Sequence, residues 1–293
     1  MNKFLLYLRM LRVKQWAKNV LVFLPVIISP YEISSQSLYA LIVTFILFCC
    51  SASLIYIVND WTDRESDAFN KNKKHRPFAN KDLHFKDAVI GFISLLIIFI
   101  FLIWEIYKIS SGVSILIIVY LTQSILYSLY LKNITLIEML IVSTGYSYRA
   151  LAGGLSVYLL PSTWMLLTIF LASLFMIAQK RLSDKSSVDS EDQMRPSIRA
   201  YPEGFLDMVT NISAASAIIS YILFSLSDYA QIKFQNPYLP LSSVFVIYAT
   251  FRYLQVAMSS LRAHDPIYLI IRDRHMKVCI FMYFVFIIAT NSF

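Results

Sequence analysis

The sequence carries little charge for its length. Only 15% of its 293 residues are Asp, Glu, Lys or Arg, whereas 58% are hydrophobic, and the mean hydropathy is +0.61. A soluble helical domain of this size would need a polar face on most helices, and several apolar runs here offer none. The low charge therefore favours a membrane protein over the alternative, a soluble protein with large buried helices.

Cysteine, glycine and proline are also scarce. The three cysteines are Cys49 and Cys50, adjacent in one apolar run, and Cys279 in another, which excludes a disulfide framework and a cysteine metal site. The four histidines lack the i, i+4 pairing of a helical zinc site. The 6 Gly and 9 Pro, mostly at expected helix ends or loops, offer little support for a transporter built from helices broken at mid-membrane.

Apolar segments that could cross about 30 Å of hydrocarbon recur along the whole chain. We expect spans at roughly 17–31, 38–59, 87–105, 110–131, 134–157, 162–182, 207–227, 239–260 and 276–292. The first and last are short, so a count of eight also fits. The predicted fold is all-α: one polytopic membrane domain over 1–293, with about nine helices bundled around a central cavity.

The basic residues indicate an orientation, because cytoplasmic loops carry the excess of Lys and Arg. With the N-terminus inside, only Lys108, Lys233, Arg149 and Arg252 of the 26 fall outside the cytoplasmic segments. Both long polar loops, 60–86 and 183–206, then lie on the cytoplasmic side and cap the cavity. Residues 1–16 mix basic and apolar side chains at helical spacing, as in an interfacial amphipathic helix. We expect a bacterial cytoplasmic (inner) membrane protein with no nucleic-acid partner.

An acidic stripe begins where the second expected span ends. On a continuing helix Asp60, Asp63 and Asp67 share one face, since they stand at i, i+3 and i+7. Three like charges on one stripe repel each other unless a cation lies between them, and hard oxygen ligands suit Mg²⁺. Asn59 could bind the metal or orient an aspartate. The alternative is a solvated acidic helix end.

A basic run follows the acidic stripe and lowers the weight of that alternative. Lys71, Lys73, Lys74 and Arg76 precede Pro77. Cations beside a metal-binding stripe supply both halves of a diphosphate clamp. The positive-inside rule could explain the lysines but not the carboxylates.

The stretch NDWTDRESD from Asn59 to Asp67 resembles the N-D-x-x-D-x-x-x-D motif of the UbiA superfamily of membrane prenyltransferases. Further segments resemble the branch of that superfamily that transfers phosphoribose to polyprenyl phosphates. They are Gln15 to Asn19, Lys73 with Arg76-Pro77, Leu131-Lys132, Gly145 with Arg149-Ala150 and Gly153-Gly154, Leu174 to Met176 with Lys180-Arg181, Arg252-Tyr253, and Asp265-Pro266 with Arg272 to Arg274. Asn70 and Lys71 depart from the His-Pro that members often have there.

The second long loop differs from that of prenyl-diphosphate users, which usually carry another aspartate-rich motif after the sixth helix. Here Asp184 is one carboxylate among the cations Lys180, Arg181, Arg195 and Arg199. One acidic and one basic motif suit a donor diphosphate plus a further phosphate. The resemblance thus implies Mg²⁺-dependent transfer of 5-phosphoribose from phosphoribosyl diphosphate to a polyprenyl phosphate, in cell-envelope lipid-linked sugar synthesis.

The resemblance also implies roles for individual residues. Expected catalytic residues are Asp60, Asp63, Lys73, Arg76 and Lys180; expected metal ligands are Asn59, Asp60, Asp63 and Asp67; expected substrate-binding residues are Lys18, Asn59, Asp67, Tyr127, Lys132, Arg149, Arg181, Asp184, Arg195 and Tyr201. Two other functions stay open: prenyl transfer from a prenyl diphosphate to an aromatic ring, and lipid or solute transport without chemistry. The sequence leaves the oligomeric state open.

Overall fold

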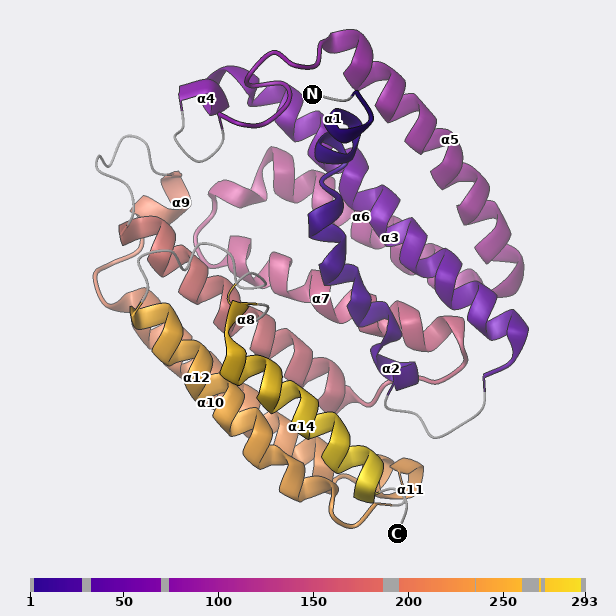
Figure 1. The fold of residues 1–293 in the computed structure, drawn as a ribbon, viewed down its shortest axis with the longest axis vertical. Coiled ribbons are helices and arrows are strands. Elements are labelled where there is room, and N and C mark those ends of the chain that lie inside the picture. The colour runs from indigo at the N-terminus through magenta and orange to yellow at the C-terminus, as the bar shows by residue number, and fades with distance from the viewer. Residues whose placement is uncertain are drawn as a thin grey trace. The chain divides into compact units, whose positions relative to one another are not determined.

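The structure, a computed structural model, describes residues 3–27, 33–69, 74–186, 195–234, 236–259, 269 and 272–290. Every regular element in these residues is a helix (Figure 1). They form two compact units. The N-terminal unit holds the described residues up to Leu129 together with Tyr148–Leu160, and the C-terminal unit holds Tyr130–Ser147 and the described residues from Pro161 onward. The expectation of one domain over 1–293 stays a prediction.

The N-terminal unit is built around one long helix. Its elements are α1 (Lys3–Met10), the 3-10 helix η1 (Val13–Phe23), α2 (Leu24–Ile27), α3 (Ser35–Thr62), α4 (Arg64–Phe69), α5 (Phe85–Ile109), α6 (Ser111–Leu129) and the end of α7 (Ile137–Ser156). α3 begins at the N-cap Ser34, whose side chain accepts a hydrogen bond from Ser37 N at 3.1 Å. It runs beside α5 (Figure 1). Leu47, Phe48 and Ile57 of α3 are fully buried in the core of this unit, so α3 fixes the place of the acidic residues at its end.

The C-terminal unit is a helical bundle with short connectors. Its elements are η2 (Leu131–Asn133), the start of α7, α8 (Thr163–Ser186), α9 (Pro196–Arg199), α10 (Phe205–Leu226), α11 (Asp228–Phe234), η4 (Leu239–Ser242), α12 (Ser243–Ser259) and α14 (Arg274–Thr290). α8 packs along α10. Phe175, Tyr253 and Met276 form one buried cluster there, and Met139, Ala178 and Leu206 form another.

Six segments of the described chain are long and apolar enough to span a membrane. They are Ser35–Thr62, Phe85–Ile109, Ser111–Leu129, Thr163–Ser186, Phe205–Leu226 and Leu239–Met258. Each matches an expected span to within a few residues. The other three expected spans fall on short or charged elements: η1 with α2, α7 with Glu138 and Arg149, and the 17-residue α14. The protein is therefore an all-helical membrane protein, and the count of nine spans stays a prediction.

The first 16 residues differ from the single amphipathic helix expected there. α1 ends at Met10, and Arg12 adopts a left-handed backbone conformation with φ 51°. The chain then continues as the 3-10 helix η1, which passes very close to α7. A Cβ built on Gly153 would lie only 1.8 Å from the carbonyl oxygen of Val22. This contact between distant segments has no local signal in the sequence.

Candidate functional site

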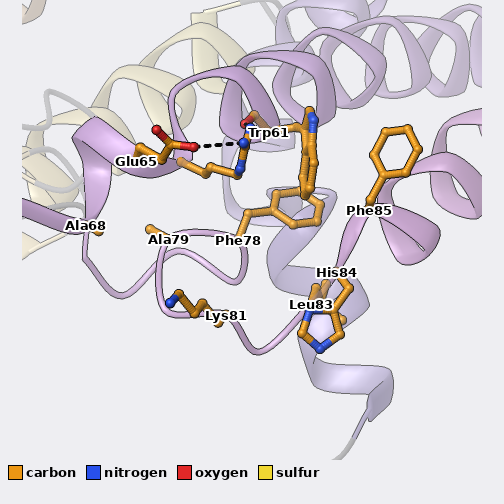
Figure 2. Close-up of a pocket in the computed structure, with 10 residues that line it drawn as sticks. Trp61, Glu65, Ala68, Phe78, Ala79, Lys81, Leu83, His84 and Phe85 are labelled. Carbon is orange, nitrogen blue, oxygen red and sulfur yellow. Dashed lines mark hydrogen bonds and ion pairs between the residues drawn. The ribbon is translucent and has the colours of Figure 1, made fainter.

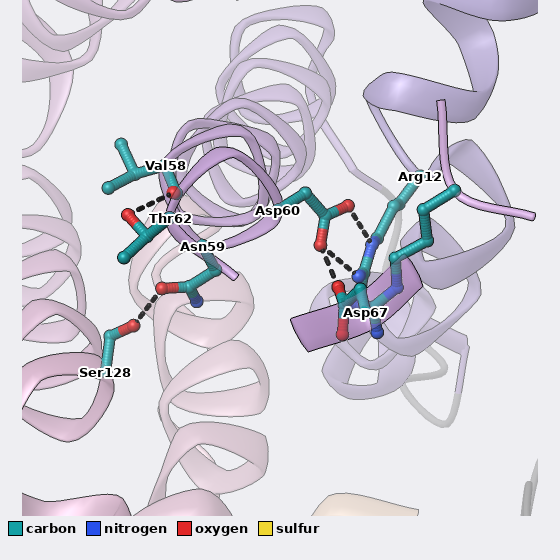
Figure 3. A network of polar contacts seen from close by, with 8 residues as sticks. Arg12, Val58, Asn59, Asp60, Thr62, Asp67 and Ser128 are labelled. Atoms are coloured by element: carbon teal, nitrogen blue, oxygen red, sulfur yellow. Dashed lines mark hydrogen bonds and ion pairs between the residues drawn. The ribbon is translucent and has the colours of Figure 1, made fainter. Parts of the chain in front are cut away.

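Two arginines contact the carboxylates of Asp60 and Asp67 at the end of α3, and one of them, Arg76, contacts both (Figure 3). Arg12 Nε donates to Asp60 Oδ2 at 2.9 Å, and Arg12 Nη2 donates to Asp60 Oδ1. Arg76 Nη1 donates to Asp60 Oδ1 at 3.0 Å and also to Asp67 Oδ2. Both carboxylates are only 2% exposed. We call these four side chains, Arg12, Asp60, Asp67 and Arg76, the acidic cluster. Its two carboxylates are balanced by its two guanidinium groups, as buried ionised groups require.

The acidic stripe does not lie on one unbroken helix. α3 ends at Thr62, Asp63 has non-helical angles, and α4 follows from Arg64. The helical hydrogen-bond pattern still crosses the junction, since Asp63 N donates to Asn59 O and Asp67 N donates to Asp63 O, both at 2.8 Å. Asp67 therefore stays close enough to Asp60 for one guanidinium to contact both. Asp63 is half-buried at the junction.

Asn59 points away from the acidic cluster. Figure 3 shows its side chain directed to one side of α3, where Ser128 Oγ donates to Asn59 Oδ1, while Asp60 is directed to the other side. Among the residues that the structure describes, no group of three or more His, Cys, Asp or Glu side chains could hold a metal ion. The four expected ligands are thus not gathered at one point in this arrangement.

The donor chemistry of the acidic cluster nevertheless fits Mg²⁺. The carboxylates of Asp60 and Asp67 already converge on one cation, the Arg76 guanidinium. Carboxylate oxygens are the protein ligands that Mg²⁺ prefers beside substrate phosphates. Guanidinium groups in turn bind phosphate oxygens through paired N–H donors. The same four side chains could therefore exchange their mutual ion pairs for a metal and a diphosphate.

Arg12 is a site residue that the sequence reasoning did not assign. It lies 48 residues before Asp60 in the chain, within a basic stretch that the positive-inside rule explains without a site. Its guanidinium also lies over the Tyr56 ring, 4.5 Å from the centroid, a favourable place for a cation. Lys73, expected beside Arg76, lies outside the described residues.

Arg149 forms a second polar site, buried in the N-terminal unit. Its Nε donates to Asn19 Oδ1 at 2.7 Å and its Nη2 donates to the Tyr120 hydroxyl at 2.8 Å. The guanidinium also lies over the rings of Phe48 and Tyr120, at 5.4 and 4.9 Å. Asn19 belongs to the QWAKN segment singled out in the sequence, so two distant motifs meet here.

Arg181 of the C-terminal unit is held by two carboxylates. Its Nε donates to both oxygens of Glu138, at 2.8 and 3.0 Å, and its Nη2 donates to Glu138 Oε2 at 2.7 Å. Its Nη1 donates to Asp184 Oδ2 at 3.1 Å. Arg181 and Glu138 are both buried. These contacts tie α8 to α7.

Tyr201 and Lys132 lie in neighbouring, cross-linked segments of the same unit. The Tyr201 hydroxyl accepts a hydrogen bond from Leu136 N at 2.8 Å. The backbone carbonyl oxygen of Tyr201 accepts one from Lys185 Nζ at 2.6 Å. Ser197 Oγ donates to the Lys132 carbonyl oxygen at 2.8 Å. These bonds fasten residues 195–205 to the connector before α7, which carries the Lys132 side chain.

The remaining expected residues lie on four different elements. Lys18 on η1, Tyr127 near the end of α6 and Lys180 on α8 are half-buried, and Arg195 is exposed at the start of α9. Lys18 and Tyr127 belong to the N-terminal unit, whereas Lys180 and Arg195 belong to the C-terminal unit. That the acidic and basic motifs form one site stays a prediction.

The described helices form a membrane domain, and the acidic cluster at the end of α3 brings carboxylates and arginines together. The chain belongs to the UbiA prenyltransferase family, whose model matches residues 22–270. It is therefore an enzyme that transfers a group.

Relatives with named activities narrow the comparison. The chain is 30% identical to a decaprenyl-phosphate phosphoribosyltransferase of Mycolicibacterium smegmatis, over 75% of this chain and 70% of the relative. It is 30% identical to the protein of that name from Corynebacterium glutamicum, over 84% of this chain and 75% of the relative. The relative of the same name from Mycobacterium tuberculosis is 28% identical over 92% of this chain and 88% of the relative.

Solved structures agree on the fold. A UbiA homologue from Archaeoglobus fulgidus, bound to GPP and Mg²⁺, superimposes with a TM-score of 0.70 at 15% identity, covering 98% of this chain and 100% of that one. A homologue from Aeropyrum pernix superimposes with a TM-score of 0.56 at 12% identity, covering 98% of this chain and 97% of that one.

Proposed function

We propose that this protein transfers 5-phosphoribose from phosphoribosyl diphosphate to a polyprenyl phosphate and releases diphosphate. The observation that carries the proposal is the similarity, over at least 70% of both chains, to relatives named for phosphoribosyl transfer to decaprenyl phosphate. The acidic cluster supplies chemistry that suits the donor, because it combines carboxylates for a metal with arginines for phosphate oxygens.

The diphosphate of the donor is assigned to the acidic cluster. Asp60 and Asp67, with Asp63 at the helix junction, would hold Mg²⁺, which supplies charge neutralisation for the leaving diphosphate when bound. Arg12 and Arg76 would bind the remaining phosphate oxygens once Asp60 and Asp67 are engaged by the metal. Ion pairs within the cluster keep these four side chains in place in the absence of donor. Asn59, hydrogen-bonded to Ser128, would orient the end of α3.

The reaction needs positioning more than proton transfer. The bond between the anomeric carbon of ribose and the diphosphate oxygen breaks, and an oxygen of the acceptor phosphate bonds to that carbon. The acceptor phosphate is already a nucleophile, so little general-base work is required. The leaving diphosphate gathers charge as its bond breaks, and cationic side chains stabilise that charge.

The other phosphates are assigned to basic residues outside the acidic cluster. The donor 5-phosphate and the acceptor phosphate require cations, and Lys18, Lys132, Lys180, Arg149 and Arg195 are the candidates. Arg181 differs from these, because Glu138 and Asp184 already engage its guanidinium. We therefore assign Arg181 to the support of Lys180 and α8.

We also propose that the chain crosses a bacterial inner membrane nine times, with its N-terminus and acidic cluster in the cytoplasm. The distribution of Lys and Arg supports this orientation. A cytoplasmic site would meet phosphoribosyl diphosphate, a charged metabolite that does not cross lipid, while the acceptor's polyprenyl chain stays in the membrane.

The experiment offers two donors to the same purified protein. Protein in detergent with Mg²⁺ and polyprenyl phosphate receives phosphoribosyl diphosphate, and a parallel sample with an aromatic acceptor receives a prenyl diphosphate. We expect diphosphate release in the first sample only, abolished by removing Mg²⁺ with a chelator. Release in the second sample alone would overturn the proposal in favour of prenyl transfer, and release in neither would favour a protein without transferase chemistry on these substrates.

A further inference from the structure

A pocket of about 560 Å³ lies beside the end of α3, lined by α4, the 78–84 segment and the start of α5 (Figure 2). Trp61, Arg64 and Glu65 line one part of it, and Phe78, Lys81, His84 and Phe85 line the rest. None of the four residues of the acidic cluster belongs to its wall. The pocket is thus separate from the proposed donor site, and the transfer reaction leaves it without a role.

The pocket has an aromatic wall. The Trp61 ring lies 5.7 Å from Phe78 in an edge-on arrangement and 5.1 Å from Phe85. Phe85 is 58% exposed, although it stands at the start of an apolar helix. An exposed aromatic group at this position suits contact with lipid.

Cations lie beside the aromatic wall. Arg64 stacks over Trp61, with its guanidinium carbon 4.3 Å from the ring, and it donates to the Trp61 carbonyl oxygen at 3.0 Å and to Glu65 Oε1 at 2.9 Å. Two of its five N–H groups are used in these bonds, so others can serve a ligand. Lys81 is exposed, and its Nζ makes no hydrogen bond or ion pair with the residues that the structure describes. Among the described residues that line the pocket, Glu65 is the only acid, beside the cations Arg64 and Lys81.

Trp61 and Phe85 stand at the ends of two candidate membrane spans, α3 and α5, which have 28 and 25 residues. Helices of these lengths measure about 42 and 38 Å, longer than the hydrocarbon core of about 30 Å. We therefore expect the last turn of α3 and the first turn of α5 to reach the headgroup layer. Tryptophan is enriched at that depth, so we expect the pocket to open at the level of the phospholipid headgroups.

We propose that this pocket binds the headgroup of an anionic glycerophospholipid from the surrounding bilayer. Lys81 and Arg64 would contact the phosphate, and the rings of Trp61, Phe78 and Phe85 would pack against the glycerol and the first methylenes. A zwitterionic lipid would leave its own cation beside Lys81 and Arg64. The pocket therefore favours a net negative headgroup such as phosphatidylglycerol.

The backbone conformation of Lys81 allows its charge to be removed by an asparagine substitution. Lys81 has φ 64°, a left-handed conformation that asparagine tolerates better than most residues. Lys81→Asn therefore removes the charge without adding backbone strain. Lys86→Gln is the matched control, because Lys86 is an exposed lysine five residues further on, outside the pocket wall.

The test measures lipid binding to delipidated protein in detergent by native mass spectrometry. Phosphatidylglycerol, phosphatidylcholine and polyprenyl phosphate are titrated separately into the unaltered protein, Lys81→Asn, Arg64→Gln and Lys86→Gln. We expect tighter first binding of phosphatidylglycerol than of phosphatidylcholine, and about fivefold weaker phosphatidylglycerol binding in Lys81→Asn, the effect of one basic residue near an anionic headgroup. Lys86→Gln should bind like the unaltered protein.

Three results would overturn the proposal. The first is equal affinity of the unaltered protein for phosphatidylglycerol and phosphatidylcholine. The second is an equal loss of phosphatidylglycerol binding in Lys81→Asn and Lys86→Gln. The third is a Lys81→Asn variant that binds polyprenyl phosphate more weakly but phosphatidylglycerol as before. The last result would assign the pocket to the acceptor. Thermal unfolding of each variant checks its fold. Lys81→Asn and Arg64→Gln change different elements, so if one variant does not fold, the other still tests the pocket. Phosphoribosyl transfer should persist in Lys81→Asn, so the outcome is independent of the proposed function.

Discussion

Asp60 contacts both arginines of the acidic cluster. The sequence predicts its nearness to Asp67 and Arg76 but not its contact with Arg12. The spacing of Asp60 and Asp67 predicts that their carboxylates lie close together, and they share Arg76. Arg12 was missed because its approach depends on the left-handed turn after α1 and on packing between segments far apart in the chain. Asn59 and Asp60 are neighbours on one helix and therefore point in different directions, but the partner of Asn59, Ser128 of α6, could not be predicted from the sequence.

Asp60→Asn tests the residue at the centre of the cluster. The amide keeps the size of the side chain but removes the charge that Arg12, Arg76 and a metal would share. Loss of one electrostatic partner of a transition-state charge lowers the rate by about 100-fold or more, and we expect that loss in kcat for phosphoribosyl transfer. Asp207→Asn, at an exposed carboxylate on α10, is the control. Equal activity in the two variants would remove Asp60 from the mechanism.

At the scale of elements, the helices could be predicted well and their interruptions could not. Apolar runs of span length match α3, α5, α6, α8 and α10 closely, because burial in lipid demands continuous backbone hydrogen bonding. The 3-10 helix η1 has no such signature. Its course depends on Gly153 of α7, because the lack of a side chain there lets η1 pack directly against the α7 backbone. The close packing of η1 on α7 brings Asn19 to Arg149.

Gly153→Ala tests this close approach. The added methyl group would lie 1.8 Å from Val22 O, and since that neighbour is backbone, η1 or α7 must shift. Overpacking of this kind costs about 1–3 kcal/mol, which we expect to see as a lower unfolding temperature in detergent. Gly112→Ala is the control, because its methyl group would meet only Leu155 side-chain atoms at 3.9 Å. Equal unfolding temperatures for both variants would contradict the packing described for Gly153.

The start of α14 supports a prediction about pH. Asp273 Oδ1 accepts a hydrogen bond from Met276 N at 2.8 Å, and Arg252 Nη2 donates to Asp273 Oδ2 at 2.7 Å. The hydrogen bond from Arg252, aided by the one from Met276, lowers the pKa of Asp273 below its ordinary value. A carboxyl with a lowered folded-state pKa stabilises the fold above its unfolded-state pKa of about 3.9. This stabilisation is lost as the pH falls through the folded-state pKa.

Asp273→Asn isolates that contribution, because the amide can still accept the bond from Met276 N. We expect the variant to unfold at a lower temperature than the unaltered protein at pH 6, with the difference shrinking as the pH falls below about 4. Asp207→Asn should show no such difference. A gap that stays constant down to pH about 2, well below both pKa values, would show that the charge of Asp273 is not what stabilises the fold.

At the scale of the whole molecule, composition predicts a helical membrane protein, and the family and the helices confirm it. The number of spans is harder to predict. α7 and α14 are less apolar or shorter than the six clear spans, so hydropathy alone does not settle them. The orientation rests on the distribution of Lys and Arg.

The two ends of α5 test that orientation. All three native cysteines are buried, so a membrane-impermeant maleimide should label an added cysteine above a low background. In intact cells we expect labelling of Lys108→Cys and none of Lys86→Cys until the membrane is opened. Labelling of Lys86→Cys alone would invert the topology and move the acidic cluster to the outer face.

The proposed transfer is tested most directly by the mass of the lipid product. Purified protein with Mg²⁺, phosphoribosyl diphosphate and polyprenyl phosphate should convert the lipid to a species heavier by one phosphoribosyl group, with one diphosphate released for each lipid converted. Asp60→Asn should form that species far more slowly. A lipid of unchanged mass, under conditions in which the protein stays folded and binds polyprenyl phosphate, would contradict the proposed function.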